Sequence, residues 1–321
     1  MFRIDDATAT PSLPTPETAG SEGYFTEGNP TAGTPATNVR GSWLNMIQEE
    51  LCAILAAAGI ARSKTSYSQV NSALQKMYAP VVGSVRNLAM NVSSVSASAT
   101  LTADQIIVAS ALNGQTYQLP SFNKTINLAN TGAGGMDTGT SPTSGYVALY
   151  AIYNPTTATS ALLAVNATSA AAPNVYGGAN MPSGYTVSAL VSVRATDPTG
   201  KLQPGMQRDR KVSFPLATLL STATTAASAT AMNVAAVIPP NAVSVGGEMG
   251  ASSTIVSAVV SLLAGDAAMS GQQAIYGGAT ASAQYICNFD VDIAVPQTLY
   301  RVATNSSGTP TFSYYASSYR F

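Results

Sequence analysis

The chain of 321 residues contains no histidine. Catalysis by Ser-His-Asp or Cys-His groups needs an imidazole base, and histidine is also the commonest metal ligand in proteins. The sequence also lacks a phosphate-binding P-loop, and its glycine-rich stretch 132–135 does not have the spacing of a dinucleotide loop. These absences exclude histidine-dependent catalysis and a nucleotide-binding loop, and we expect no metal site and no cofactor.

The chain also has few charged residues. Charged residues make up 9% of the chain, against about 25% in an average soluble domain. The 14 basic residues are scattered, and no basic stripe could displace counterions from phosphates, so nucleic-acid binding is not expected. Two explanations of the low charge stay open: a surface buried between identical chains, or a surface solvated by Ser, Thr, Asn and Gln.

Long hydrophobic runs are missing too. The longest, Leu51–Ala58 and Ile255–Ala264, are far shorter than the about 20 residues of a membrane-spanning helix, so membrane insertion is not expected. The N-terminal sequence lacks the apolar region of a secretory signal, and we expect synthesis in a cytoplasm. The two cysteines, Cys52 and Cys287, are expected to be buried free thiols.

Residues 1–41 form an arm rich in Pro, Thr, Ala and Gly, without a helical or strand period. Such a segment cannot build a core by itself. Its spaced apolar residues are Phe2, Ile4, Tyr24 and Phe25, and an extended arm with anchors is what groove binding or strand addition to a partner requires. The alternative is a disordered tail.

Residues 42–80 predict a helical hairpin. Ser42 is the expected N-cap of a first helix that runs to about Ala58 before Gly59. Ser66 is expected to cap a second helix. The apolar stripes comprise Leu44, Ile47, Leu51, Ile54, Leu55 and Ala58 in the first helix, and Tyr67, Val70, Leu74 and Met77 in the second. Neither helix is long enough to be stable alone, so the pair must pack on something.

From residue 81 onward, short strand-like runs alternate with turn signals. The expected fold class is mainly β, with antiparallel β domains that end in a β-sandwich or jelly roll. We place a domain boundary at Pro215. It separates a central β-rich domain, residues 81–214, from a C-terminal β-sandwich, residues 215–321.

Two groups of motifs carry a family resemblance. GYFTEGNP at 23–30 is followed by WLNMIQEEL at 43–51, and GYVALYAIYNP at 145–155 is followed by NVYGGANMP at 174–182. They resemble the N-terminal and central regions of tail fibre proteins of tailed bacteriophages and prophages. The resemblance implies a structural protein of the phage virion, made in the host cytoplasm, that assembles as a homotrimer.

The resemblance also implies two ends with different partners. The N-terminal region would bind baseplate or tail-tip proteins of the phage, and the C-terminal β domain would bind glycan or protein on the host surface. The expected virion-attachment residues are Phe2, Ile4, Tyr24, Phe25, Trp43 and Leu44.

The C-terminal stretch 311–321 is rich in aromatic residues separated by Ser and Ala. Tyrosines in such surroundings suit stacking on sugar rings or apolar contact with a protein. The candidate receptor-binding residues are Tyr300, Tyr314, Tyr315 and Tyr319. The alternative is that Phe312, Tyr314 and Phe321 are core residues of a closing strand.

The competing function is glycan cleavage by a tail depolymerase, because a pair of carboxylates needs no histidine. The candidate acids are Glu248, Asp266, Asp290 and Asp292. Asp290 and Asp292 alternate around Val291, so they are expected on one face of a strand, about 7 Å apart. That spacing fits solvent-facing acids or a weak calcium site equally well. We expect an attachment protein and not an enzyme.

Overall fold

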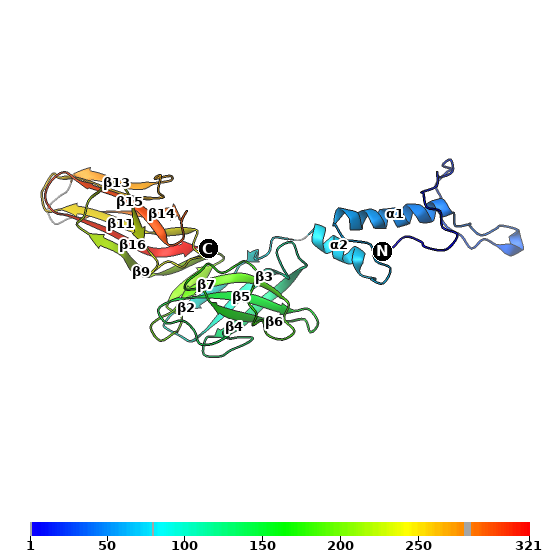
Figure 1. Cartoon of the computed structure of the whole chain (residues 1–321), viewed down its shortest axis with the longest axis horizontal. Helices are drawn as coiled ribbons and strands as arrows, with labels where there is room; N and C mark the ends of the chain where they lie inside the picture. Colours follow the sequence, from blue (N-terminus) through cyan, green and yellow to red (C-terminus); the bar gives the residue numbers. More distant parts are fainter. Residues whose placement is uncertain (1, 79, 279–283) are drawn as a thin grey trace. The chain divides into compact units, whose positions relative to one another are not determined.

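The computed structural model describes residues 2–78, 80–278 and 284–321. The chain divides into two compact units, Met1–Ala79 and Pro80–Phe321, which we call the arm-and-hairpin unit and the β unit (Figure 1). Strands account for 44% of the chain and helices for 9%. This composition, with large antiparallel sheets, confirms the expected fold class.

The hairpin consists of α1 (Gly41–Ala57) and α2 (Gln69–Met77). Both predicted N-caps are wrong: Arg40 and Ser68 hold those positions, neither with a side-chain cap. Ser42 instead lies in the first turn of α1, where its hydroxyl donates to Glu17 at 2.9 Å. The predicted end of the first helix is correct, because Gly59 follows with a left-handed φ of 64°.

The hairpin has a very small core. It consists of Leu55, Ala58 and Ala73, with Cys52 also buried on α1. The prediction that Tyr67, Leu74 and Met77 form part of a buried apolar stripe on the second helix is wrong. Tyr67 is fully exposed, and Leu74 and Met77 are exposed as well. Residues 68 and 69 open this short helix later than expected, and Gln69 turns inward in place of Tyr67.

The arm contains one short 3-10 helix, η1 (Pro30–Ala32), capped by the side chain of Asn29. Thr26 and Thr37 hydrogen-bond across it, so this segment forms a narrow loop. From residue 2 to residue 40 no side chain is buried. As expected from its composition, the arm has no core of its own.

In its described residues, 80–278 and 284–321, the β unit contains sixteen strands. The first nine are β1 (Val85–Arg86), β2 (Ala89–Val92), β3 (Ser98–Ala109), β4 (Thr116–Asn127), β5 (Tyr146–Asn154), β6 (Thr159–Asn166), β7 (Val187–Ala195), β8 (Gly205–Arg208) and β9 (Lys211–Thr222). The others are β10 (Ala226–Asn233), β11 (Ser244–Ser253), β12 (Val259–Gly265), β13 (Gln273–Gly278), β14 (Tyr285–Asp292), β15 (Thr298–Asn305) and β16 (Pro310–Arg320).

A twelve-stranded sheet runs in the order β14-β11-β16-β9-β8-β2-β3-β7-β5-β6, with β1 and β4 paired to β3. A four-stranded sheet has the order β10-β15-β12-β13. Every pairing between these named strands is antiparallel. The expected boundary at Pro215 falls inside β9, which pairs with β8 through residues 211–213 and with β16 up to Thr222.

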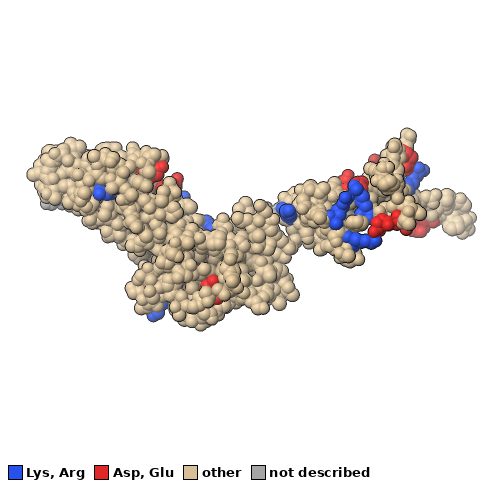
Figure 2. Space-filling view, viewed as in Figure 1, with Lys and Arg blue, Asp and Glu red and all other residues tan. Residues whose placement is uncertain are grey.

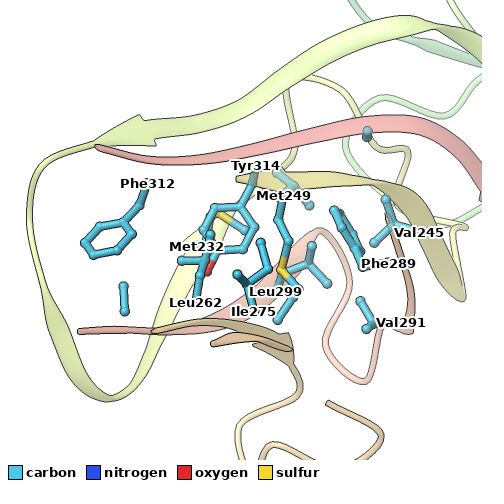
Figure 3. Packing of buried hydrophobic residues seen from close by; sticks show 14 of the residues in the cluster. Met232, Val245, Met249, Leu262, Ile275, Phe289, Val291, Leu299, Phe312 and Tyr314 are labelled. Atoms are coloured by element: carbon cyan, nitrogen blue, oxygen red, sulfur yellow. The ribbon is translucent and has the colours of Figure 1, made fainter. Parts of the chain in front are cut away.

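The C-terminal part of the β unit is a sandwich. Strands β9, β16, β11 and β14 form one layer, and the four-stranded sheet forms the other. Figure 3 shows the apolar side chains that fill the space between them, among them Phe312, Tyr314 and Met249. Burial of these alternating residues provides the main stabilisation of the two layers.

Two further apolar clusters lie in the central part, on either side of β5 and β7. Polar contacts join this part to the sandwich: the Tyr319 hydroxyl donates to the Val193 carbonyl at 2.6 Å, and the Tyr146 hydroxyl donates to the Ala235 carbonyl at 2.9 Å. Phe321 packs against apolar clusters of both parts. Within residues 2–78, 80–278 and 284–321, no helix is long and apolar enough to cross a membrane.

Candidate functional sites on the arm and on the outer sandwich face

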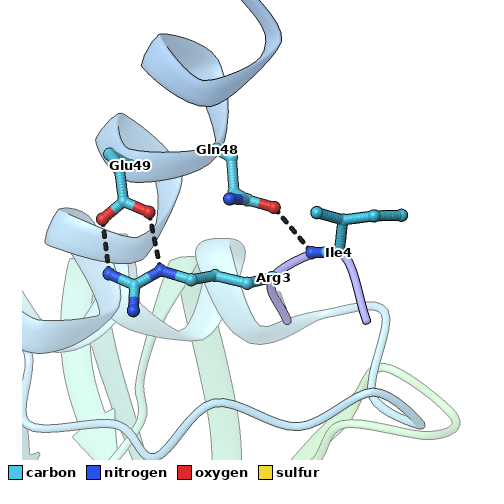
Figure 4. Close-up of polar contacts among 4 residues, drawn as sticks. All are labelled: Arg3, Ile4, Gln48 and Glu49. Atoms are coloured by element: carbon cyan, nitrogen blue, oxygen red, sulfur yellow. Dashed lines mark hydrogen bonds and ion pairs between the residues drawn. The ribbon is translucent and has the colours of Figure 1, made fainter. Parts of the chain in front are cut away.

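Ion pairs hold the arm to the hairpin. The Arg3 guanidinium donates to both carboxylate oxygens of Glu49, at 2.6 and 2.5 Å, and the Ile4 amide donates to Gln48 Oε1 at 2.7 Å (Figure 4). A further pair joins Lys64 of the hairpin to Asp5 at 2.7 Å, and within the arm Arg40 pairs with Glu17 at 3.1 Å. Figure 2 shows charged atoms gathered on this unit.

These pairs perturb the carboxyl groups. The hydrogen bond from Arg3 lowers the pKa of Glu49, and the hydrogen bond from Lys64 lowers the pKa of Asp5. Arg3, Asp5 and Lys64 are exposed and Glu49 is half-buried, and such surface pairs contribute little because water and salt screen them. The arm is therefore docked weakly and reversibly.

An aromatic contact marks the middle of the arm. The Phe25 and Trp43 rings meet edge to face, with centroids 5.0 Å apart and an interplanar angle of 77°. Trp43 thus joins the arm to the start of α1, while 40% of it stays exposed. A groove of about 820 Å³ lies beside this contact. Its lining includes Pro14, Pro16, Tyr24, Phe25, Trp43 and Met46.

The structure brings only part of the expected attachment set together. Tyr24, Phe25 and Trp43 line one groove, and Tyr24 is 98% exposed. Phe2 and Ile4 are exposed too, but they flank the Arg3–Glu49 pair further along α1. Leu44 is exposed on α1 without lining the groove.

Two of the four tyrosines that we expected to bind a receptor are core residues. Tyr314 is fully buried and donates to the Leu263 carbonyl at 2.8 Å, and Tyr319 is 3% exposed. Burial raises the pKa of both phenols. Neither ring can stack on a ligand, so the prediction was wrong for these two, and the alternative of a closing core strand holds for Tyr314 and Phe312.

The other two lie on different layers of the sandwich. Tyr300 belongs to β15 and alternates with the buried Leu299, so it faces outward from the four-stranded sheet. Tyr315 lies on β16 between the buried Tyr314 and Ala316, so it faces outward from the opposite layer. One ligand cannot contact both rings at a single site.

Strand register places polar side chains next to Tyr315. Tyr315 is paired with Thr218 on β9 and with Glu248 on β11, and Glu248 is paired with Asn288 on β14. The four residues form a row across the outer face of the layer. We call this row, Thr218–Tyr315–Glu248–Asn288, the Tyr315 row. It combines one aromatic ring with hydroxyl, carboxylate and amide groups, a set that suits polar ligands such as sugars.

Thr218 and Asn288 were not singled out from the sequence. The signal that identifies them is strand register, and register follows from pairing between segments far apart in the chain. Glu248 was considered only as a candidate acid. It lies beside a half-buried tyrosine on the outer face of the layer, where its carboxylate can accept a hydrogen bond.

The candidate acids do not gather into a pocket. Asp290 and Asp292 are exposed on the outer face of β14, as expected for alternating residues. Asp266 accepts backbone hydrogen bonds from Ala268 and Ser270 in a turn, which lower its pKa. In the described part of the chain, no group of three or more Asp, Glu or Cys residues could hold a metal ion.

Comparison with known proteins gives limited overlap. No protein-family model matches the chain. The uncharacterized protein StfP of Escherichia coli (strain K12) is 40% identical over 77 residues, which are 24% of this chain and 35% of StfP. The chain thus spans about a third of the length of this relative.

Two solved viral structures align over much of the chain. The structure of infectious bursal disease virus Gx strain covers 76% of this chain and 75% of its own, with 12% identity and a TM-score of 0.23. The alignment with the VP2 subviral particle of the same virus covers 74% of this chain and 71% of the VP2 chain, with 13% identity and a TM-score of 0.16. TM-scores this low establish no common fold.

Proposed function

We propose that the chain is a structural protein of a phage tail, a tail fibre that binds the virion through its N-terminal unit and the host surface through its sandwich. The proposal assigns it binding and no catalysis. The observation that supports it most is a groove in the arm-and-hairpin unit. Aromatic residues from the motif region 23–51 line this groove and stay exposed to solvent. Its support from known proteins is the resemblance of the motifs to tail fibre proteins.

The arm is suited to a partner because its apolar anchors are unburied in the chain itself. Tyr24 exposes nearly its whole ring and Phe25 exposes 55%. Burying such a side chain in a partner contributes roughly 1.5–3 kcal/mol. The ion pairs that dock the arm are exposed, so exchanging them for contacts with a baseplate or tail-tip protein costs little.

The host contact is assigned to the Tyr315 row. It lies on an outer sheet face, and its aromatic and polar groups suit a glycan or a polar protein surface. A single such contact is weak, about −4 kcal/mol at millimolar affinity. Three copies in a homotrimeric fibre would add avidity.

Incorporation into particles tests the virion end. Tyr24→Ala with Phe25→Ala should reduce the chain in purified particles at least tenfold, measured by immunoblot. The matched control is Tyr67→Ala, since Tyr67 is fully exposed and does not line the groove. Normal incorporation of the double variant would refute the assignment of the groove.

Adsorption to host cells tests the other end. Particles with Tyr315→Ala should lose adsorption, whereas particles with Tyr300→Ala should keep it, because Tyr300 faces outward from the opposite layer. Both variants should incorporate normally. If Tyr300→Ala alone impairs adsorption, the receptor site lies on the four-stranded sheet.

A further inference from the structure

The first residues of the arm lie across the hairpin, and we call residues 2–6 the N-terminal strap. Arg3 and Ile4 bind side chains of α1 through the guanidinium and the backbone amide (Figure 4). Asp5 accepts from Lys64, which lies in the connection between α1 and α2, at 2.9 and 2.7 Å. The strap thus bridges two segments of the hairpin, although none of its own side chains is buried.

A pocket of about 470 Å³ lies beside the strap. Arg3 forms one wall, and the apolar lining consists of Cys52, Ala53, Ala56 and Ile60. The strap places no apolar side chain in this pocket, because Phe2 and Ile4 are exposed and do not line it. The contacts of the strap therefore use the charges around the pocket and do not fill its apolar interior.

The charges on and next to the pocket follow a fixed order. Glu49 lies on the α1 side, and Arg62 and Lys64 lie in the connection that follows α1. Side chains two residues apart in an extended segment lie on one side of it, about 7 Å apart. A cation followed two residues later by an anion can therefore pair at both places at once, as Arg3 and Asp5 do.

We propose that this pocket binds an extended segment of another protein of the virion, and that the N-terminal strap is an internal pseudo-ligand that occupies the site until this segment displaces it. The bound segment has the charge order of the strap, a cation and then an anion two residues later, and it adds one apolar side chain that enters the pocket. The site shares Glu49 with the groove at Trp43 and otherwise has its own lining. Its role in the virion rests on the proposed function.

Burial of apolar surface decides between the strap and the partner segment. Both make the same surface ion pairs, which are weak, but only the partner segment removes apolar surface from water in the pocket. The strap has the advantage of its tether, which gives it an effective concentration on the order of millimolar. Segments that offer the charges alone are therefore excluded, whereas a segment that also fills the pocket displaces the strap.

Labelling of Cys52 measures whether the strap closes the pocket. Cys52 is 5% exposed and lines the pocket, and Cys287→Ser removes the other free thiol. In the Cys287→Ser background, the strap variant Arg3→Gln with Asp5→Asn should react with N-ethylmaleimide about threefold faster, the change expected when surface ion pairs of ordinary strength are lost.

A matched control separates the strap from the rest of the arm. Glu17→Gln with Arg40→Gln removes an exposed ion pair whose residues do not line the pocket, and it should keep the labelling rate of the background. The far-ultraviolet circular dichroism should be the same in all variants, which excludes unfolding as the cause of faster labelling. Equal labelling rates with and without the strap charges would show that the strap does not close the pocket, and would overturn the proposal.

A peptide added to the strap variant tests recognition of the charge order. The probe is an acetylated and amidated peptide with the sequence of residues 2–6, FRIDD, and the control peptide FDIRD exchanges its arginine with its first aspartate. At about 10 mM, chosen because single weak contacts have millimolar affinity, FRIDD should restore slow labelling of Cys52 and FDIRD should leave it fast. No protection by FRIDD, or equal protection by both peptides, would overturn the proposal.

Incorporation into particles should change in opposite directions for the two sides of these contacts. With the wild-type chain co-produced as competitor, the strap variant should be enriched in particles, because its site is no longer blocked. Glu49→Gln with Lys64→Gln should be depleted, because the site has lost its charges. Equal depletion of both variants would mean that the contacts only dock the arm, and the pseudo-ligand role would be refuted.

These outcomes are separable from failure of the proposed function. If FRIDD binds and the wild-type chain never enters particles, the pocket and its pseudo-ligand stand and the virion role falls. If the chain enters particles and neither peptide binds, virion attachment stands and the pseudo-ligand falls.

Discussion

At the scale of single residues, neighbouring tyrosines on β16 have different surroundings. Tyr314 and Tyr319 are buried and hydrogen-bonded to carbonyl groups, while Tyr315 faces out of the sheet. If a buried tyrosine hydroxyl is removed, the backbone carbonyl that accepted its hydrogen bond is left without a partner. An outward-facing hydroxyl can be replaced by water as the partner of its neighbours. The same side-chain chemistry therefore has a structural role at two positions and a proposed binding role at one.

Tyr319→Phe should lower the free energy of unfolding by about 1 kcal/mol, because the hydrogen bond to the Val193 carbonyl is lost. Urea unfolding followed by circular dichroism measures this. Tyr315→Phe, on the same strand, is the matched control and should stay within about 0.5 kcal/mol of wild type. Equal effects of the two changes would mean that the buried hydroxyl contributes nothing.

Alkaline titration should reveal the buried phenols. Burial raises the pKa of Tyr146, Tyr150, Tyr314 and Tyr319 above the ordinary 10.0. A raised pKa in the folded state means that these groups stabilise the fold fully below pH 10, and that this stability is lost as pH rises through the folded values. Phenolate absorbance should therefore rise in two steps, the second together with unfolding. One smooth step in a still-folded protein would contradict this.

Glycine on β11 offers a second test at this scale. A Cβ at Gly247 would lie 1.9 Å from the backbone oxygen of Tyr315, which cannot move without disturbing β16. Gly247→Ala should cost about 1–3 kcal/mol by thermal unfolding. A Cβ at Gly250 meets only the flexible end of Gln284, so Gly250→Ala should cost clearly less. The reverse order would contradict the packing of β11 on β16.

At the scale of elements, the arm and β9 behave in opposite ways. The arm buries no side chain between residues 2 and 40 and is held by exposed ion pairs. Strand β9 pairs along its length with β16 and, at its start, with β8. Exposed pairs exchange easily with salt, whereas a strand between two neighbours opens only with its sheet.

Acid should release the arm. Glu49 and Asp5 have a lowered pKa in the docked arm, so their contribution is present above the ordinary values of 4.5 and 3.8 and is lost as pH falls through the lowered ones. Between about pH 6 and about pH 2, fluorescence of Trp43 should shift to the red as Phe25 leaves it. Arg3→Gln with Lys64→Gln should show the shifted emission already at neutral pH. An unchanged spectrum would mean that the aromatic contact alone holds the arm.

At the scale of the whole molecule, the chain is divided between a unit almost without a core and a unit with three apolar clusters. The scarcity of charge belongs mainly to the second, whose visible surface in Figure 2 is largely uncharged. Strand pairing satisfies its backbone internally, so this unit does not need the hairpin for its fold.

Residues 80–321 produced alone should therefore fold. Their circular dichroism should show a β spectrum, and the midpoint of thermal unfolding should lie within a few degrees of the β transition of the whole chain. Residues 1–79 alone should unfold without a cooperative transition at low concentration, because their buried core is so small. A fragment 80–321 that aggregates or lacks β structure would show that the units depend on each other.

The sequence by itself determined the elements. The period of apolar residues located both helices, Gly59 ended the first of them, and short runs with turn residues predicted a mainly β chain with a terminal sandwich. These features follow from local preferences and from the side chain that each backbone position favours. The exposure of the apolar residues of the arm follows for the same reason, since a segment without a period has no core to bury them.

Only the tertiary structure decided which faces are buried. Strict alternation along β16 would place Tyr319 on the same side as the outward-facing Tyr315. In the fold, pairing with β11 shifts between Gly246 and Gly247, where β16 has one residue more than its partner. Such a bulge moves every later side chain to the other face. Tyr319 therefore turns into the core, because the register of two strands far apart in the chain is set by their pairing and not by either strand alone.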